Sequence, residues 1–422
     1  MTYQEALDFL YPLHRFGIKP GLDRVRSLLA GAGSPQKRLG LIVHIAGTNG
    51  KGSVAAALAS IFQAAGKKCA LYTSPHLVDF TERIRINGQQ IPRERVAHYC
   101  TLFRDAAVAG QSTFFEVTTA IAFAWFASEG VEVSIIETGM GGRLDATNVV
   151  ESDYALITTI ALDHTDWLGD TLALIAAEKA AIIKPKSRVY TAVSEPEAFR
   201  AIKQMAEECH APLFVAGKDS ICRLIAVEPG MVACELTTAL RHYPVLKAPL
   251  TGSFHSSTLS LAVMVAENAG IAPEHIAAGL EGLLQTGYRA RLEQIGRHPA
   301  LFLDVSHNPA GMRETVNTLS LFRHRYRHIH VLLGLASDKD ARAIICELLR
   351  LDCTFVLVNI PSERSVEAET LGSLCYEEGG EFRVCSTGKE GLAYLLEKAD
   401  TDDLILVTGS FYLVGELLAA AT

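Results

Sequence analysis

The chain has 422 residues and a formal net charge of −8; 49% of its residues are hydrophobic and 20% are charged. A single hydrophobic core rarely grows beyond roughly 250–300 residues, so the length predicts two domains. The acidic balance argues against nucleic acid or an anionic membrane as a partner. The first residues show no secretory leader, and nine scattered cysteines lack any Cys-x-x-Cys pair. We therefore expect a cytoplasmic protein without zinc or disulfides.

Strand-like and helix-like runs alternate through the first half of the chain. Leu41–Ala46 is typical of a short buried strand, and the Ala-rich run 53–65 after it is typical of a helix. Further elements follow, with strands predicted at 133–137 and 155–160 and helices at 115–126 and 171–183. This rhythm predicts an α/β fold with a doubly wound, mostly parallel sheet.

The rhythm changes in the second half. The apolar runs 224–227 and 232–236 flank Glu228-Pro-Gly-Met, which is typical of a β-hairpin, and a helix-like stretch covers 256–268. Strand-like runs then return at 300–304, 329–333, 354–358, 381–385 and 404–408. We place the domain boundary near residue 290. The prediction is a first domain at 1–288 and a second, smaller, Rossmann-like α/β domain at 289–422.

A glycine-rich segment joins the first strand to the first long helix. In His44-Ile-Ala-Gly-Thr-Asn-Gly-Lys-Gly-Ser53, glycines allow a tight turn whose N–H groups can face phosphate oxygens. Lys51 can reach the β- and γ-phosphates, and Ser53 can bond to phosphate or metal. Gly52 separates Lys51 from Ser53, so the strict Walker pattern fails. The alternative interpretation is a simple strand–helix turn.

Three residues near predicted strand ends are candidates for a metal site. Glu137 and His164 each follow a predicted strand, and ligands bind at the carboxyl ends of strands in open α/β sheets. A carboxylate near a phosphate loop is the expected holder of Mg²⁺. Lys179 lies in an Ala/Ile-rich helix. Taken alone, Glu137 is also compatible with a plain Gly-rich turn, and Lys179 is more simply explained as a solvated helix lysine.

These segments together resemble the Mur ligase superfamily and, within it, the folylpolyglutamate synthase/dihydrofolate synthase family. The resemblance covers nearly the whole chain. It is carried by 43–53, Tyr72-Thr-Ser-Pro-His-Leu77, Glu82–Gly88, Phe114–Glu116, Glu137–Asn148, Leu162–Gly169, Glu178-Lys179, Leu303–Pro309, Asp338-Lys-Asp340 and Thr408–Glu416. The runs Thr73–Leu77 and Gly139–Asn148 separate folate ligases from cell-wall ligases.

The resemblance implies a role for several residues of the first domain. ATP phosphates would be cradled by Asn49, Gly50, Lys51, Gly52 and Ser53. Two Mg²⁺ ions would be held by Ser74, Glu137, His164 and a carbamate on Lys179 derived from CO₂. A direct catalytic role falls to Lys51, Lys179 and His164. The pterin site would be lined by Leu22, Asp23, Arg24, Phe114, Phe115, Glu116, Leu144, Asp145 and Ala146.

The linker and the second domain complete this expected site. Arg291 and Asp304 would reach the nucleotide, and His307 and Ser410 would lie near the glutamate pocket. The chain departs from the family pattern at two places. Arg289-Ala-Arg291 replaces the usual Pro-Gly-Arg of the linker, and 251–259 lacks the family's ATP-contacting Asn, for which Thr258 or Ser257 would have to substitute.

The expected activity is an ATP-dependent ligase that adds L-glutamate to a folate-type carboxylate through an acyl phosphate, acting as a monomer on small molecules. Two alternatives stay open at this level. A cell-wall Mur ligase usually carries an extra N-terminal domain, whereas here the phosphate loop begins at residue 47. A nucleotide-binding switch without ligase chemistry would not need the Asp304, His307 and Asn308 cluster. The sequence does not choose between dihydropteroate and a folate as the acceptor.

Overall fold

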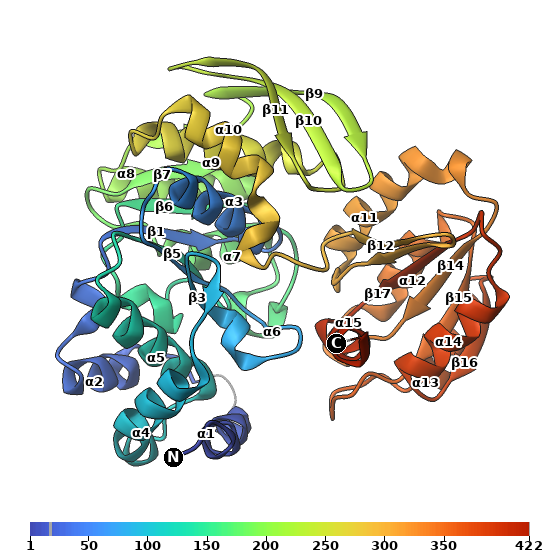
Figure 1. Cartoon of the computed structure of the whole chain (residues 1–422), viewed down its shortest axis with the longest axis horizontal. Helices are drawn as coiled ribbons and strands as arrows, with labels where there is room; N and C mark the ends of the chain where they lie inside the picture. Colours follow the sequence, from blue (N-terminus) through green and yellow to red (C-terminus); the bar gives the residue numbers. More distant parts are fainter. Residues whose placement is uncertain (17–18, 422) are drawn as a thin grey trace. The chain divides into compact units, whose positions relative to one another are not determined.

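The structure, a computed structural model, describes residues 1–16 and 19–421 (Figure 1). The chain divides into two compact units. The first contains Met1–Arg223, Glu235–Leu246 and Ser256–Tyr288, and the second contains Leu224–Cys234, Lys247–His255 and Arg289–Thr422. The second unit thus includes parts of the hairpin region as well as everything after residue 288. None of the described helices is long and apolar enough to cross a membrane.

The first unit is built on an eight-stranded sheet, in which six strands are parallel and two at one edge are antiparallel. Its strand order is β4 (Gln89–Gln90), β3 (Ile84–Ile86), β2 (Cys69–Tyr72), β5 (Val133–Glu137), β1 (Leu41–Ala46), β6 (Tyr154–Ile157), β7 (Arg188–Thr191) and β8 (Leu213–Val215). β1 lies at the centre between β5 and β6, so the loop after it is flanked by two further strand ends.

Helices cover both faces of this sheet. On one face, α3 (Lys51–Ala64) packs on β1, β2 and β5, and α10 (Pro273–Glu281) packs on α3 (Figure 1). On the other, Ile42 and Ile136 join a core with α1 (Tyr3–Leu10), α2 (Asp23–Gly31), α4 (Arg93–Ala109) and α5 (Phe114–Glu129). Ala46 and Ile157 join a core with α7 (Leu172–Ala180) and α8 (Pro196–Glu208). Because side chains alternate along a strand, Ile42 and Ala46 point to the same face, and they reach two cores at different points along β1.

A three-stranded sheet follows, in the order β11 (His242–Ala248), β10 (Met231–Thr238) and β9 (Ser220–Glu228). Gly230 turns the β9–β10 connection with φ 73°, a left-handed conformation that favours glycine. The chain then forms α9 (His255–Asn268), which belongs to the first unit from Ser256 onward. The sequence predicted the hairpin but missed β11, because Pro244 and alternating exposure give this strand a weak apolar pattern.

The second unit contains a six-stranded sheet that is parallel except for one edge strand. Its order is β12 (Glu293–Arg297), β13 (Ala300–Leu303), β17 (Leu404–Thr408), β14 (Ile329–Leu333), β15 (Cys353–Val358) and β16 (Glu381–Cys385). One face carries α11 (Pro309–Phe322), α12 (Ala341–Leu349) and α13 (Ala368–Glu377), which share the core. The other carries α14 (Gly388–Lys398) and α15 (Phe411–Ala421) (Figure 1).

The predicted fold class is confirmed, and each parallel strand that the apolar runs predicted is present. The parallel strands β2, β7 and β8 of the first sheet were not predicted. The antiparallel strands β3, β4 and β12 were not predicted, since they are short or partly exposed and carry little hydrophobic signal. The helix predicted at 171–183 ends earlier, at Ala180, and the strand predicted at 155–160 ends at Ile157.

Candidate active site

The phosphate loop connects β1 to α3 and leaves room for no side chain at its first glycine. Gly47 has φ 151°, and a Cβ there would lie 1.8 Å from the Thr158 hydroxyl oxygen. Gly50 has φ 84° at the residue before the first turn of α3. Glycine is therefore required at both positions by sterics, as expected for a loop whose backbone approaches a phosphate.

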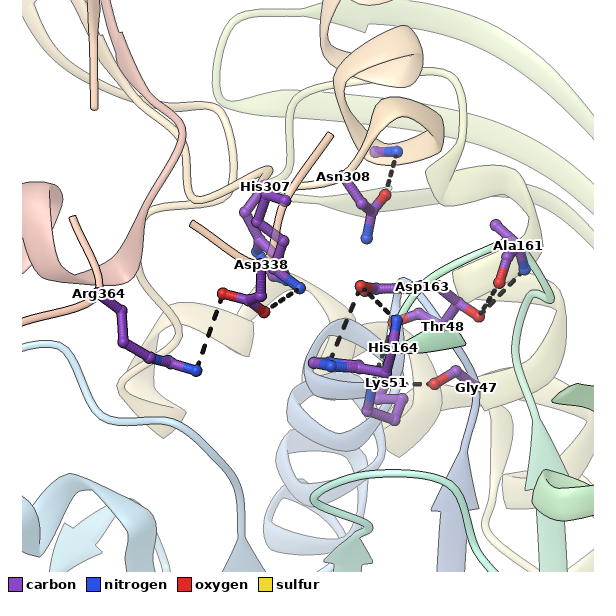
Figure 2. Close-up of polar contacts among 12 residues, drawn as sticks. Gly47, Thr48, Lys51, Ala161, Asp163, His164, His307, Asn308, Asp338 and Arg364 are labelled. Atoms are coloured by element: carbon purple, nitrogen blue, oxygen red, sulfur yellow. Dashed lines mark hydrogen bonds and ion pairs between the residues drawn. The ribbon is translucent and has the colours of Figure 1, made fainter. Parts of the chain in front are cut away.

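Hydrogen bonds hold this loop in place before any ligand binds. Thr48 N donates to Thr159 O (2.7 Å), and the Thr158 hydroxyl donates to Asn49 O (2.7 Å). The Thr48 hydroxyl bonds to the Ala161 backbone (Figure 2). The Lys51 ammonium folds back onto Gly47 O (3.0 Å) and Thr48 O (3.1 Å). The loop is thus a preorganised cradle with a cation over it.

Ser53 and Gly52 begin α3 directly after Lys51. Ser53 is buried, and its hydroxyl lies 2.7 Å from the hydroxyl of Tyr288, the last residue of the first unit. In this state the Ser53 hydroxyl bonds to a side chain that sequence reasoning did not single out.

Glu137 and Ser74 come together at the ends of neighbouring strands. β5 ends at Glu137, which is 4% exposed, and β2 ends two residues before Ser74. Ser74 N donates to Glu137 Oε2 at 3.2 Å. The prediction that Glu137 stands at the carboxyl end of a parallel strand is confirmed.

His164 lies beside a carboxylate that the sequence reasoning overlooked. It has φ 52° at the start of the short helix α6 (Thr165–Leu168), and its backbone N–H donates to Asp163 Oδ1 at 3.0 Å. Its Nε2 lies 3.9 Å from the same oxygen (Figure 2). The signal was in the sequence, as Asp163 precedes His164 directly.

Lys179 is buried, so its interpretation as a solvated lysine is wrong. It is 4% exposed in α7, and no described side chain forms a hydrogen bond or ion pair with its ammonium. Burial and, to a smaller extent, the positive charge of Lys51 lower its pKa to about 7, although Asp163 and Asp145 oppose this. A substantial fraction of this lysine is therefore a neutral amine near pH 7.

The described residues contain no group of three or more His, Cys, Asp and Glu side chains arranged to hold a metal ion. The four predicted ligands therefore appear as a Ser74–Glu137 pair, an Asp163–His164 pair and a separate buried Lys179. Mg²⁺ in nucleotide sites is often held by one or two carboxylates together with substrate phosphates and water. The donors found here suit that mode.

The segment 139–148 is organised around Asp145. Its Oδ2 accepts from Gly139 N (2.9 Å) and Met140 N (3.0 Å), and its Oδ1 accepts from Thr147 N (3.0 Å) and the Thr147 hydroxyl. Burial raises its pKa, although these bonds oppose the change. The carboxylate therefore holds its own loop, whereas Leu144 beside it is 36% exposed.

The other predicted pterin residues gather around α2 and α5. Glu116 is 4% exposed, accepts from Arg24 Nε at 3.0 Å and caps α5 through Thr113. The Arg83 guanidinium lies 5.2 Å from the centre of the Phe114 ring. Phe115 fills the space beside Gly139, where a Cβ would lie 2.7 Å from its ring. The structure thus brings 114–116 to the 139–148 loop, whereas Asp23 has a fully exposed side chain.

In the second unit, Asp304 directly follows β13 and links the linker to the sheet. It is 3% exposed and accepts from Leu292 N (3.1 Å), Ser306 N (3.3 Å) and the Thr315 hydroxyl (2.7 Å). Three of its roughly four acceptor positions are thus used within the unit. The Asp304 carboxylate therefore holds the local backbone in place. Its contact with a nucleotide stays a prediction.

Phe411 connects the other predicted residues of this unit. The Arg291 guanidinium lies 4.8 Å from the centre of its ring, and the His307 ring lies 5.9 Å from it. His307 Nδ1 is 2.8 Å from Val305 O and donates to it, since a carbonyl cannot donate. Ser410 precedes Phe411 at the end of β17 and is 5% exposed. Arg291, His307 and Ser410 therefore share one neighbourhood.

A charged cluster lies after β14 and β15. Arg364 Nη1 lies 3.8 Å from Asp338 Oδ1 (Figure 2), and Lys339 Nζ lies 3.4 Å from Asp338 Oδ2. Ser337 N donates to Arg364 O at 2.7 Å, which joins the two loops. Burial raises the pKa of Asp338, but Lys339 and Arg364 lower it more, so the net pKa is below its usual value.

Comparisons with known proteins agree with this geometry. The Mur ligase middle domain matches residues 45–266, and the Mur ligase glutamate ligase domain matches 290–411. A dihydrofolate synthase/folylpolyglutamate synthase of Bacillus subtilis is 32% identical, over 99% of this chain and 98% of the relative. The chain belongs to the dihydrofolate synthase/folylpolyglutamate synthase family.

Solved structures of the family extend over the same length. Escherichia coli FolC in complex with DHPP and ADP has a TM-score of 0.89 and 28% identity, covering 100% of this chain and 98% of that one. A Mycobacterium tuberculosis folylpolyglutamate synthase complexed with ADP and AMPPCP has a TM-score of 0.88 and 30% identity, covering 98% of both chains. A Yersinia pestis bifunctional enzyme of the family, at TM-score 0.86 and 30% identity, was solved with AMPPNP and Mn.

The linker departs from the family pattern in sequence but keeps an unusual backbone. Ala290 has φ 57° and Leu292 has φ 51°, both in the left-handed region. Ala290 stands where the family usually has glycine, and a non-glycine residue there is strained by roughly 1–2 kcal/mol. Hydrogen bonds from Ala290 N to Glu293 and from Leu292 N to Asp304 hold this conformation.

Three residues that sequence reasoning did not assign lie in the candidate site: Asp163, Tyr288 and Phe411. Asp163 and Phe411 sit inside segments that carried the resemblance, so their position was a usable signal. Tyr288 had none, because only folding brings it to Ser53, which is 235 residues away in the sequence.

Proposed function

We propose that this chain is an ATP-dependent ligase that joins L-glutamate to a folate-type carboxylate, acting as a folylpolyglutamate synthase, a dihydrofolate synthase or both. The observation that carries the proposal is the full-length match to enzymes named for these two activities, combined with a preorganised phosphate loop. A cell-wall ligase is not favoured, because the relatives that span the whole chain are named as folate enzymes.

The chemistry follows from the groups around the loop. An oxygen of the acceptor carboxylate attacks the γ-phosphorus of ATP, ADP leaves, and an acyl phosphate forms. The amine of glutamate then attacks the acyl carbon, and phosphate leaves as the amide forms. Phosphoryl transfer depends mainly on positioning and charge neutralisation. The N–H groups at the start of α3 and the Lys51 ammonium are placed to supply both.

A divalent metal fits the donors of the first unit. Glu137, Ser74 and His164 would hold Mg²⁺ together with ATP phosphates, and relatives were solved with ADP, AMPPNP and Mn. When bound, Mg²⁺ neutralises negative charge so that two anionic reactants can approach. Asp163 would orient His164 and add negative charge beside it.

Lys179 would act in this site as a carbamate. Its neutral amine attacks the carbon of CO₂, a C–N bond forms as one C=O π bond opens onto its oxygen, and one N–H proton of the nitrogen is released to solvent. The product is an anionic oxygen donor, which suits Mg²⁺. The support is its burial without a partner and its pKa of about 7. An ammonium at this position would instead repel a cation.

The second unit would supply glutamate binding, with His307 and Ser410 near the amino acid and Arg291 and Asp304 toward the nucleotide. In domain terms, 1–288 would bind ATP and the folate, and 289–422 would be the glutamate-ligase domain. We further propose a cytoplasmic monomer, in keeping with nine free cysteines. Size-exclusion chromatography with light scattering tests the monomer.

Turnover with separate acceptors tests the function. Purified protein is incubated with ATP, Mg²⁺, glutamate and either dihydropteroate or a reduced folate, and phosphate and product mass are measured. Phosphate release and a product heavier by one glutamyl residue should require both acceptor and glutamate. The same rate of phosphate release with and without the acceptor and glutamate would contradict the proposal. The acceptor that supports turnover decides between the two synthase activities.

A further inference from the structure

The strand that leads into the phosphate loop is linked by a buried hydrogen-bonded chain to the loop 139–148. His44 lies in β1, three residues before Gly47, and is 0% exposed. Its Nε2 lies 2.8 Å from the Thr147 hydroxyl oxygen, and that hydroxyl bonds to Asp145 Oδ1. Thr147 is also fully buried. Three side chains therefore connect strand β1 to the 139–148 loop through the interior.

The direction of these bonds follows from counting protons. A hydroxyl has one proton, and the Asp145 carboxylate can only accept when ionised, so Thr147 donates to Asp145. Thr147 must then accept from His44, which fixes the Nε2–H tautomer of the imidazole. Burial lowers the pKa of His44 to about 3, so that it stays neutral. Its Nδ1, which has no proton in this tautomer, has no partner among the described residues.

Other bonds tie this 139–148 loop to the helix α7 region, from Arg143 N to Glu178 O (2.8 Å) and from Asn148 Nδ2 to Ala181 O (3.2 Å), so the chain through Thr147 adds a link to a different element, β1. The 139–148 loop is closed by Asp145, whose two oxygens accept four bonds from the loop itself. Of these side chains only Thr147 also reaches the central strand. A shift of the loop relative to β1 would break the His44 bond and leave buried polar atoms unpaired, which is costly.

We propose that Thr147 is a positioning residue: the chain His44–Thr147–Asp145 fixes the loop that carries 144–146 relative to the strand of the phosphate loop. This inference rests on the proposed function, in which 1–288 binds the folate, and on the role that the family resemblance implies for Leu144–Ala146 in lining the pterin site. The consequence is a set distance between the acceptor and the γ-phosphate. Small misplacements of a bound substrate reduce reaction rates strongly.

Substitutions at Thr147 test the inference. Thr147→Val keeps the shape of the side chain but loses both bonds, and Thr147→Ser keeps both. We expect Thr147→Val to raise the KM for the pterin acceptor by about tenfold or more, since a bond to a charged group is lost. The KM for ATP should change by less than about twofold, and Thr147→Ser should stay near the parent. Ser134→Ala is the matched control, because it removes an equally buried hydroxyl bond, to Leu39 O, at the other end of β5.

The possible outcomes distinguish the role of Thr147 from the proposed ligase function. Binding of dihydropteroate and of an ATP analogue to each variant is measured by calorimetry beside turnover and thermal melts. A folded Thr147→Val protein with parental pterin affinity and KM would overturn the inference and leave the proposed function intact. Equal losses for ATP and pterin would also overturn it. Should Thr147→Val not fold, His44→Phe, which removes one bond, decides by the same readouts. A parent that binds no pterin would refute the proposed function, and the inference with it.

Discussion

The carboxyl edges of the two parallel sheets differ in the direction in which the pKa values of their ionisable side chains are shifted. At the edge of the first unit, Lys179 and Asp145 are buried, and the pKa of each is shifted toward its neutral form. In the second unit, Asp338 is flanked by Lys339 and Arg364, and its pKa is shifted toward the ionised form. Groups whose pKa is shifted by burial often cluster at functional sites. The difference supports our proposal that phosphoryl transfer takes place on the first unit.

The strongest test of this comparison is removal of the cation over the phosphate loop. Lys51→Ala should reduce turnover by about a hundredfold to a thousandfold or more, because a charge-stabilising group of the transition state is lost. The fold should survive, since Lys51 lies in the phosphate loop and not in the hydrophobic core. Turnover is measured beside a thermal melt. Near-parental turnover would remove this loop from the reaction.

Lys179 tests whether the buried lysine at this edge of the first sheet takes part in the reaction. Lys179→Ala should lower turnover severely, and acetate should restore part of it by replacing the carbamate oxygen donors. Because carbamate formation needs the neutral amine, parental activity should rise with pH through about 7, the pKa of Lys179. Depleting CO₂ should lower activity reversibly. Lys179→Ala with normal turnover would exclude the carbamate, as would an acetate effect of equal size on the parent.

Asp304 tests the second unit. Asp304→Asn keeps an acceptor but loses the charge, so the bonds from Leu292 N and Ser306 N weaken while the side chain keeps its size. We expect turnover to fall about tenfold to a hundredfold, with ATP binding to the protein weakened. Asp338→Asn is a suitable comparison on the same sheet edge. Equal ATP affinity in parent and Asp304→Asn would contradict the predicted reach to the nucleotide.

Asp403 tests stability away from both sites. Burial raises its pKa, but the Asp400 and His328 amides and His330 lower it more, and the net pKa is below its usual value. A lowered carboxyl pKa contributes stability above the unfolded value near 4, which is lost as pH falls through the folded value. Asp403→Asn should therefore lower Tm by a few degrees at pH 7. Melts at decreasing pH should show the two curves converging, and a constant difference would refute this account.

The smallest effect is expected at Tyr288. Tyr288→Phe removes the hydroxyl that lies 2.7 Å from the Ser53 hydroxyl. The KM for ATP should fall or stay within about threefold of the parent, because a phosphate no longer competes with Tyr288 for Ser53. Nucleotide titration and a thermal melt measure this. A large rise in the KM for ATP would mean that the bond is part of the nucleotide site.

The sequence by itself determined the fold class, the phosphate loop and the strand-end position of Glu137, because apolar runs and glycine requirements are local signals. It also carried the family, since the motifs lie in order along the chain. Only the tertiary structure decided that Lys179 is buried without a partner, that Asp145 spends its acceptors on its own loop, and that His44 reaches Thr147 and Ser53 reaches Tyr288. Those facts depend on contacts between segments far apart in sequence, and burial and charge arise only where such segments pack together.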